Sequence, residues 1–429
     1  MTKVPLDDVL QQAAQRFGTP CFVYFTDTIE RRIRELERAF GGRFALSYAV
    51  KSNPNPALLE WLKGRVPCLD VSSIGEMRLA QQAGWEPRRL SFTGPAKQER
   101  ELREAIAGGI GELVLESLRE ARLADRLARS LGRNQKVLVR IAPDSVPKGF
   151  GDHMAGRPAA FGIDIEDVAA ALPEIASMPN LRLAGFHIYS GTQCLRPDAI
   201  VENYRTFIGL FRSLCAKYAI APEVLIFGSG LGIPYHDNDA PLDLFQVAHA
   251  IAPDLDELRA LPHFSGTHLR LELGRYLVGE AGYFVTRVVS IKRSRGARFA
   301  ICNGGMNNHL PASGNFGMVI RRNYSMHKVG AKAETALEKV DIAGPLCTSI
   351  DKLASGIELP RLEEGDLIAV HNSGAYGLTA SPLLFISHAP AAELMFGDGT
   401  LRDISRFGSC WPSSSPVSAV PGGLEISAA

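Results

Sequence analysis

Short apolar runs alternate with amphipathic stretches from about residue 30 to residue 275. The apolar runs have the length of strands and fall at residues 45–50, 68–71, 90–93, 112–115, 137–141, 184–188, 223–227 and 268–272. Stretches with helical periodicity lie between most of them, at residues 28–40, 57–63, 74–83, 98–107, 118–131, 165–176 and 200–218. About eight strand–helix repeats in a row predict an α/β fold, a TIM-type (β/α)8 barrel.

The runner-up is an open, doubly wound sheet. That fold favours a glycine-rich turn after the first strand, and the chain has Lys51-Ser52-Asn53-Pro54 there instead. The barrel is therefore the better prediction.

The pattern changes beyond Gly282, where helical periodicity becomes scarce. Runs rich in Val, Ile and Phe predict strands at residues 284–292, 298–302, 339–343, 367–371 and 383–387. We expect a barrel over residues 26–280 and a β-rich domain over residues 281–410, joined by residues 1–25. Residues 411–429 are rich in Ser, Pro and Gly and predict a disordered tail.

Composition and charge exclude several classes of protein. The 429 residues carry a net charge of only +1, which gives no electrostatic case for nucleic acid or an anionic membrane. Asp7 and Asp8 interrupt the N-terminus, so we expect no signal peptide, and no run of about 18 apolar residues predicts a membrane span. Seven cysteines without a CxxC pair indicate neither a disulfide framework nor a zinc site. A cytoplasmic protein without a metal is the expectation.

Lys51 is the first candidate for chemistry, because it ends the uncharged strand at residues 45–50. A desolvated amine at the mouth of a barrel is a nucleophile that forms a Schiff base with an aldehyde. The alternative is a lysine that extends from a strand end to solvent.

Two further strand ends carry chemistry. The turn Gly228-Ser229-Gly230 follows a strand, where backbone N–H groups of a late barrel loop can converge on a phosphate. Glu272 and Arg275 end the last strand, and they suit a protonated ring nitrogen and an anionic group. A flexible turn and a structural Glu–Arg pair are the respective alternatives.

The C-terminal half adds two turns. Cys347 and Asp351 share one turn, and Tyr376 is exposed by the turn Gly374–Gly377. Their alternatives are a buried thiol in a domain loop and an aromatic anchor.

These segments occur in one order along the chain: YAVKSNP, DVSSIGE, GFHIYSGTQ, GSGLGIPY, ELGR, GPLCTSID and SGAYG. The order resembles the fold-type III decarboxylases that depend on pyridoxal 5'-phosphate (PLP), the group containing ornithine, arginine and diaminopimelate decarboxylases. The likeness runs from about residue 18 to residue 396. It implies a PLP-binding barrel, a β-rich C-terminal domain and a head-to-tail homodimer with shared active sites.

The resemblance also implies roles in holding the cofactor. Lys51 would form the Schiff base with PLP, and Glu272 would face the pyridine nitrogen with Asp70 and Glu76 close by. The phosphate would be held by Gly228, Ser229, Gly230, Arg275 and Tyr376.

Two roles on the substrate side follow from the same likeness. Cys347 would cross the dimer interface as the acid that protonates the substrate carbon after carbon dioxide leaves. Asp351, from the same loop of the partner, would contact substrate. Apart from the likeness, the guanidinium of Arg275 could by its own chemistry pair with a substrate carboxylate.

The chain departs from the family in three places. The family's ring-stacking histidine is replaced by Tyr189, with His187 two residues earlier, so either ring could stack on PLP. Ser229 stands where the family has glycine in the phosphate turn. Diaminopimelate decarboxylases have an arginine for the distal carboxylate shortly after a GMN segment, and none follows Gly305-Met306-Asn307.

The chain continues instead to Arg321 and Arg322, with Ser381-Pro382 after the SGAYG turn. These features resemble a side branch that includes the butirosin-pathway decarboxylase of a glutamyl carrier protein and exosortase-associated decarboxylases. We therefore expect PLP-dependent decarboxylation of an L-amino acid, or of a carrier-bound or conjugated derivative that Arg321 helps to bind. Alternatives are decarboxylation of free diaminopimelate, ornithine or lysine, amino-acid racemization, and a PLP-binding regulator without activity.

Overall fold

The protein is described here by a computed structural model, which covers residues 4–316, 318, 321–332 and 335–407. Eight parallel strands close into a barrel: β2 (Ala45–Ala49), β3 (Cys68–Val71), β4 (Leu90–Phe92), β5 (Glu112–Leu115), β6 (Gln135–Ala142), β9 (Leu181–Ile188), β11 (Val224–Gly228) and β12 (His268–Leu273). Closure comes from the pairing of β12 with β2 and of β5 with β6. The predicted barrel is confirmed, and the open sheet is excluded.

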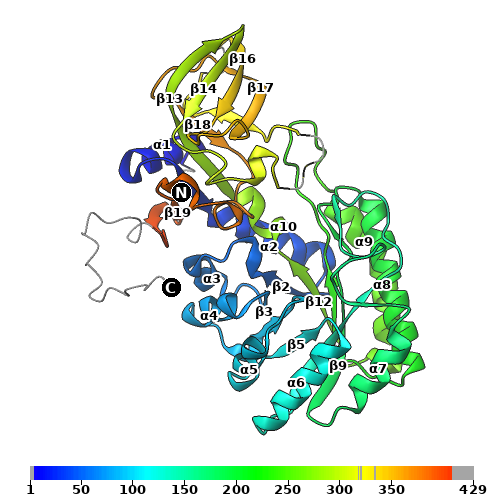
Figure 1. Ribbon diagram of the computed structural model, residues 1–429. Helices are drawn as coiled ribbons and strands as arrows, with labels where there is room; N and C mark the ends of the chain where they lie inside the picture. Colours follow the sequence, from blue (N-terminus) through cyan, green and yellow to red (C-terminus); the bar gives the residue numbers. More distant parts are fainter. Residues whose placement is uncertain (1–3, 317, 319–320, 333–334, 408–429) are drawn as a thin grey trace, which may run out of the picture.

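Helices surround the barrel (Figure 1). They are α2 (Thr26–Phe40), α3 (Pro56–Leu62), α4 (Ile74–Gln82), α5 (Glu99–Ala107), α6 (Leu118–Ser130), α7 (Val168–Ser177), α8 (Pro197–Lys217) and α9 (Leu244–Ala260). Local chemistry fixes several starts; for example, the side chain of Ser117 accepts a hydrogen bond from the N–H of Glu120 at the start of α6. Helix α9 was not predicted from the sequence, because Pro253 interrupts its helical periodicity.

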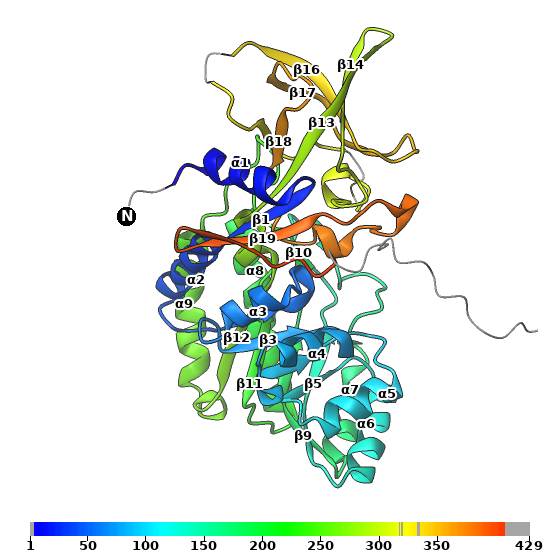
Figure 2. The ribbon, with the colours of Figure 1, turned by 90° about the vertical axis from the view of Figure 1, so that its left-hand side faces the viewer.

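The β-rich unit is a second sheet that contains both ends of the described chain. It comprises β1 (Cys21–Phe25), β13 (Gly282–Ser294), β14 (Ala297–Cys302), β15 (Met326–Lys328), β16 (Leu337–Ala343), β17 (Lys352–Pro360), β18 (Leu367–Val370), β19 (Ala392–Gly397) and β20 (Thr400–Asp403). Strand β1 lies between β13, to which it is antiparallel, and β19, to which it is parallel, and α1 (Leu6–Phe17) packs near it (Figure 2). The exact domain bounds stay a prediction.

One predicted strand is wrong. Residues 383–387 form turns and a short 3₁₀ segment (Phe385–Ser387), with Leu384 72% exposed and Ile386 at a positive φ. The next strand along the chain is β19, which lies between β1 and β20. The predicted tail at residues 411–429 lies outside the described residues.

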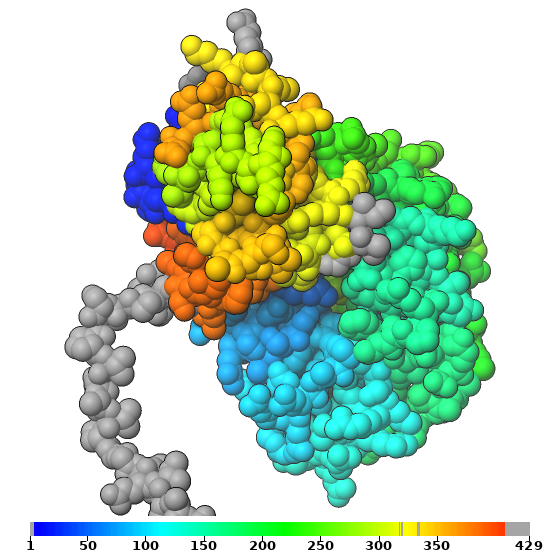
Figure 3. Space-filling view, turned by 45° about the horizontal axis from the view of Figure 1, so that its top comes forward, coloured from blue at the N-terminus to red at the C-terminus, as the bar shows by residue number. Residues whose placement is uncertain are grey.

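The β-rich unit packs against one end of the barrel (Figure 3). Hydrogen bonds join the two parts: the N–H of Tyr376 donates to the carbonyl of Ser52 at 2.7 Å, and the Asn372 amide donates to the carbonyl of Pro234. The loops of the β-rich unit therefore reach the carboxyl ends of the barrel strands, where chemistry gathers in this fold.

Candidate active site

Strand register brings the predicted site residues together. Lys51 follows β2 directly, in the 3₁₀ segment Val50–Ser52, and Asp70 on β3 is paired with Ala49. Glu272 on β12 is paired with Gly228 at the end of β11. All of these side chains belong to the same end of one closed barrel.

Lys51 is surrounded by anionic and phenolic groups. Burial lowers the pKa of its ammonium, yet Tyr376, Glu272 and Asp70 outweigh burial and hold the pKa above its ordinary value. The expectation that desolvation frees the amine is therefore wrong for this arrangement.

Two carboxylates near Lys51 differ in protonation. Burial would raise the pKa of Glu272, but the hydrogen bond from His187 and the charge of Lys51 bring it below its ordinary value. Burial and the charge of Glu272 raise the pKa of Asp70 well above its usual range. Glu272 therefore holds a negative charge more readily than Asp70 does.

Glu76 lies beyond Asp70 and shapes the turn after β3. Its carboxylate accepts the N–H of Ser72 at 2.7 Å, and burial raises its pKa. Glu76 supports this loop, and it is not among the described residues that line the hollow around Lys51.

Tyr189 and His187 occupy different layers. The Nζ atom of Lys51 lies 5.7 Å from the centre of the Tyr189 ring, and a Cβ on Gly228 would approach that ring to 2.2 Å. His187 lies deeper and contacts Glu272. Tyr189 is thus the ring available for stacking.

A cation and a glycine turn form the other side of the chamber. Arg275 donates to the Tyr235 hydroxyl at 2.6 Å, and its guanidinium lies 5.4 Å and 4.8 Å from the ring centres of Tyr235 and Tyr376. Gly230 has a φ of +67°, and a Cβ there would meet the Phe150 ring at 2.5 Å. The turn therefore requires glycine at this point.

Ser229 is held by the barrel itself. Its N–H donates to the carbonyl of Glu272 at 3.1 Å, and its carbonyl accepts from the Tyr204 hydroxyl at 2.8 Å. The serine side chain, rather than its backbone N–H, is the group that this position can offer to an anion.

Two hollows meet at these residues. A narrow chamber is lined by Ala49, Lys51, Tyr189, Thr192, Ser229, Leu231, Glu272, Gly274, Arg275, Tyr276 and Tyr376. A vestibule with a cavity volume of about 480 Å³ shares Thr192, Arg275 and Tyr376 with the chamber. The vestibule opens between the barrel loops and the β-rich unit, and its walls include Tyr235, Phe316, Arg322 and Tyr324.

The chamber fits PLP in the chemistry of its groups. It offers an amine for the aldehyde, a carboxylate for the ring nitrogen, an aromatic face and a cation. Among the buried polar atoms without a partner in the described residues, three belong to predicted site residues in or beside the chamber: Asp70 Oδ2, His187 Nδ1 and Arg275 Nε. Such orphaned atoms in a polar chamber are consistent with a site built for a ligand.

Three predicted residues lie apart from the chamber. Cys347 is exposed. Asp351 is buried, and its two oxygens accept the N–H groups of Met306 and Leu346 at 2.7 and 2.8 Å. Arg321 donates to the carbonyl of Lys352 and lines a separate surface depression, which Arg322 also borders.

Sequence reasoning missed several residues of the site. Tyr235 and Tyr324 have ring centres 4.7 Å apart in the vestibule wall, although they are 89 positions apart in the sequence and belong to different units. The Tyr that follows the GSGLGIP turn was the available signal for Tyr235. Nothing in the sequence marked Tyr324, because it comes from a loop of the β-rich unit.

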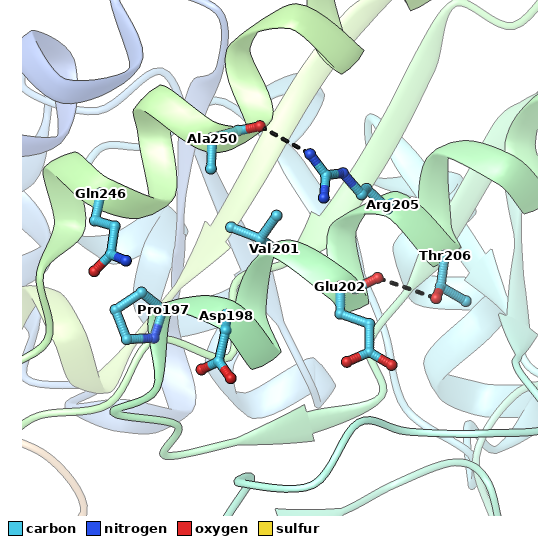
Figure 4. Close-up of a pocket in the computed structure, with 8 residues that line it drawn as sticks. All are labelled: Pro197, Asp198, Val201, Glu202, Arg205, Thr206, Gln246 and Ala250. Atoms are coloured by element: carbon cyan, nitrogen blue, oxygen red, sulfur yellow. Dashed lines mark hydrogen bonds between the residues drawn. The ribbon is translucent and has the colours of Figure 1, made fainter.

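A shallow groove on the outside of the barrel is a different feature. It lies between α8 and α9 and is lined by Pro197, Asp198, Val201, Glu202, Arg205, Thr206, Gln246 and Ala250 (Figure 4). Arg205 donates to the carbonyl of Ala250, so the cation serves the packing of the two helices. None of the residues predicted for chemistry lies there.

Comparison with known proteins covers nearly the whole chain. The family profile described as "Pyridoxal-dependent decarboxylase, pyridoxal binding domain" matches residues 26–279. The chain is 34% identical over 401 residues to the L-glutamyl-[BtrI acyl-carrier protein] decarboxylase of Niallia circulans, covering 92% of each chain. It is 31% identical over 404 residues to the diaminopimelate decarboxylase of Aquifex aeolicus, covering 92% of this chain and 91% of the relative.

A solved structure has the same architecture. Diaminopimelate decarboxylase from Helicobacter pylori, complexed with L-lysine, superposes with a TM-score of 0.82 at 28% identity, over 92% of this chain and 96% of that one. No helix among the described residues is long and apolar enough to cross a membrane.

Proposed function

The chain belongs to the pyridoxal-dependent decarboxylases, and on that premise we propose that it decarboxylates an L-amino acid that is tethered to a carrier protein or conjugated through its side chain. PLP is its cofactor. When bound, PLP supplies an electron sink for the bond that breaks between Cα and the carboxylate.

The residues of the chamber would divide the work of holding that cofactor. Lys51 carries it as a Schiff base, Tyr189 covers one face of its ring, and Glu272 faces its ring nitrogen. The phosphate is bound by Gly228, Ser229, Gly230, Arg275 and Tyr376. Orientation and electrostatics are what the protein adds to the cofactor's chemistry.

The second half of the site would come from another copy of the chain. We propose a homodimer in which Cys347 of one protomer returns a proton to the substrate carbon in the other. Its exposure in a single chain is consistent with that role. A substrate contact by Asp351 requires its buried carboxylate to accept a further hydrogen bond, or to be released from the two that it accepts here.

The observation that favours a tethered or conjugated substrate is the vestibule. Its cavity volume of about 480 Å³ lies within the range of pockets that hold drug-sized ligands, so it has room for more than a small free amino acid. Its described lining contains two arginines: Arg275 is bonded to Tyr235, and Arg322 is paired with Asp239 at 2.8 Å. Neither is left free for the distal carboxylate of diaminopimelate. A relative is named for a carrier-bound glutamyl substrate.

The alternatives differ in what they release. Decarboxylation of free diaminopimelate, ornithine or lysine gives carbon dioxide without a carrier. Racemization leaves the substrate mass unchanged, and a PLP-binding regulator does neither.

The deciding experiment supplies the purified holoenzyme with aminoacyl carrier proteins and with the matching free amino acids. Carbon dioxide release and the intact mass of the carrier are followed together. We expect the carrier or conjugate to lose the mass of carbon dioxide faster than any free amino acid. Equal or faster turnover of a free amino acid contradicts the tethered substrate but leaves decarboxylation standing.

A further inference from the structure

His187 and Glu272 meet inside the barrel although their strands are not neighbours. Strand β11 separates β9 from β12. The Nε2 atom of His187 nevertheless lies 3.0 Å from Oε2 of Glu272, with the side chains only 1% and 3% exposed. A buried contact of this kind is well ordered and little screened by solvent.

The direction of this hydrogen bond follows from the acceptor. An ionised carboxylate only accepts, so the proton must lie on Nε2 of His187. The other ring nitrogen, Nδ1, is buried and has no partner among the described residues. Glu272 is therefore the one polar partner that the structure gives to this imidazole.

Asp70 competes with Glu272 for the negative charge. Two carboxylates that both face Lys51 repel each other, and the better solvated one keeps the charge. Asp70 accepts from the hydroxyl groups of Thr93 and Ser91, which are neutral donors. Glu272 accepts from an imidazole and also experiences the charge of Arg140.

We propose that His187 is a positioning residue that acts through Glu272: its Nε2–H fixes the orientation of the carboxylate and keeps the negative charge on Glu272 rather than on Asp70. The inference rests on the proposed function, because it takes Glu272 as the partner of the cofactor's ring nitrogen. A charged carboxylate keeps that nitrogen protonated, whereas a carboxylate that rotates or gains a proton does not. His187 therefore controls the protonation of the cofactor without touching it.

The test compares holoenzymes loaded with PLP that carries ¹⁵N in the ring. The variants are His187→Leu, which removes the donor, His187→Gln, whose amide nitrogen can reach the same oxygen, and Glu272→Gln. Gln135→Leu is the matched control, because Gln135 is a buried polar residue at the opposite end of the barrel and donates to the carbonyl of Ile110. The readouts are the ¹⁵N chemical shift against pH, the melting temperature, and kcat and KM separately.

Loss of one hydrogen bond to a charged group costs about 1.5–3 kcal/mol, which corresponds to a factor of about 10 to 150. We expect His187→Leu to shift the ring-nitrogen titration to lower pH by at least about one unit and to lower kcat at least about tenfold, with KM little changed. His187→Gln should restore most of both effects, and Gln135→Leu should change neither. Lys51, Asp70 and Arg140 also face Glu272, and they are the same in all variants.

The outcomes separate the proposed role of Glu272 from the proposed role of His187. If Glu272→Gln leaves the ¹⁵N signal unchanged, the proposed role of Glu272 fails. If Glu272→Gln changes the signal and His187→Leu does not, the present inference is overturned. Should His187→Leu fold poorly, His187→Asn, which is too short to reach Oε2, replaces it; an unchanged signal in that folded variant overturns the inference equally.

Discussion

The amine of Lys51 lies 5.7 Å from the centre of the Tyr189 ring. The tyrosine ring is pressed against Gly228, which leaves no room for a side chain on the other strand. The same close approach that fixes the ring also brings the phosphate turn next to it. We therefore expect the proposed binding of the cofactor ring and of its phosphate to be coupled through this one packing contact.

The first prediction concerns this ring. Tyr189→Phe keeps the aromatic face, so its dissociation constant for PLP should change less than about threefold. Tyr189→Ala removes stacking and buried area worth about 1.5–3 kcal/mol, so the constant should rise at least about tenfold. Equilibrium dialysis of the apoenzyme measures both. Equal affinities for all three proteins would show that the ring does not contact the cofactor.

The second prediction concerns Lys51. The purified protein should be yellow, and borohydride should attach the cofactor covalently to the peptide that contains Lys51. Lys97 is the matched control, because it is a buried lysine paired with Glu120 at 2.6 Å and should stay unlabelled. Labelling of Lys97, or of any other lysine in place of Lys51, contradicts the assignment.

The third prediction concerns assembly. Lys51→Ala and Cys347→Ala should each be nearly inactive as pure dimers. If each site combines Lys51 of one chain with Cys347 of the other, subunit exchange should restore up to about a quarter of wild-type activity, because half of the dimers are mixed and each has one intact site. Absence of recovery after exchange, verified by native mass spectrometry, would count against shared sites.

How much of this fold the sequence predicts depends on whether an element is set by its own residues or by contacts with residues distant in the sequence. The strands at residues 68–71 and 112–115 were predicted with the bounds that the structure has, because a barrel strand is a local apolar run. The strand β19 was missed because it contains Glu393, a buried charge that resembles a surface residue until its partners, Tyr24 and Arg406, are known.

The site follows the same division. Register at the carboxyl ends of adjacent strands made the meeting of Lys51, Asp70 and Glu272 predictable. The place of Tyr324 in the vestibule wall was not predictable, since this residue comes from an irregular loop whose path is set by tertiary packing. The contact between His187 and Glu272 crosses an intervening strand, and no local pattern signals it.

The fourth prediction concerns His309 and acid stability. His309 is fully buried; its Nδ1 accepts the N–H of Ala312, and its Nε2 lies 2.9 Å from the Ser373 hydroxyl. Burial lowers the pKa of His309 to about 3, so the unfolded state takes up a proton at higher pH than the folded state. Above about pH 6.5 the neutral state of His309 therefore does not lower the free energy of unfolding. As the pH falls from 6.5 towards 3, the free energy of unfolding decreases progressively.

Urea unfolding at pH 7 and at pH 4.5 measures this loss. The part due to His309 is at most about 3 kcal/mol between these values. In His309→Gln, which does not titrate, the difference between the two pH values should be smaller, even if the variant is less stable at both. An identical difference in wild type and variant would show that His309 does not carry the acid sensitivity.

The last prediction concerns the pair formed by Arg322 and Asp239 in the vestibule. Asp239 neutralises the guanidinium at 2.8 Å, so a free distal carboxylate would meet a charge that is already compensated. Free meso-diaminopimelate should therefore be a poor substrate, with kcat/KM below about 10⁴ M⁻¹s⁻¹.

Arg322→Ala should raise KM for the tethered or conjugated substrate about tenfold, since it removes one wall contact and leaves Asp239 unpaired. Arg321→Ala is the matched neighbour: its guanidinium donates to the carbonyl of Lys352 outside the vestibule, and KM should change less than about threefold. A larger effect from Arg321 than from Arg322 would place the attached group in the outer depression instead, and efficient turnover of free diaminopimelate would contradict the substrate proposal altogether.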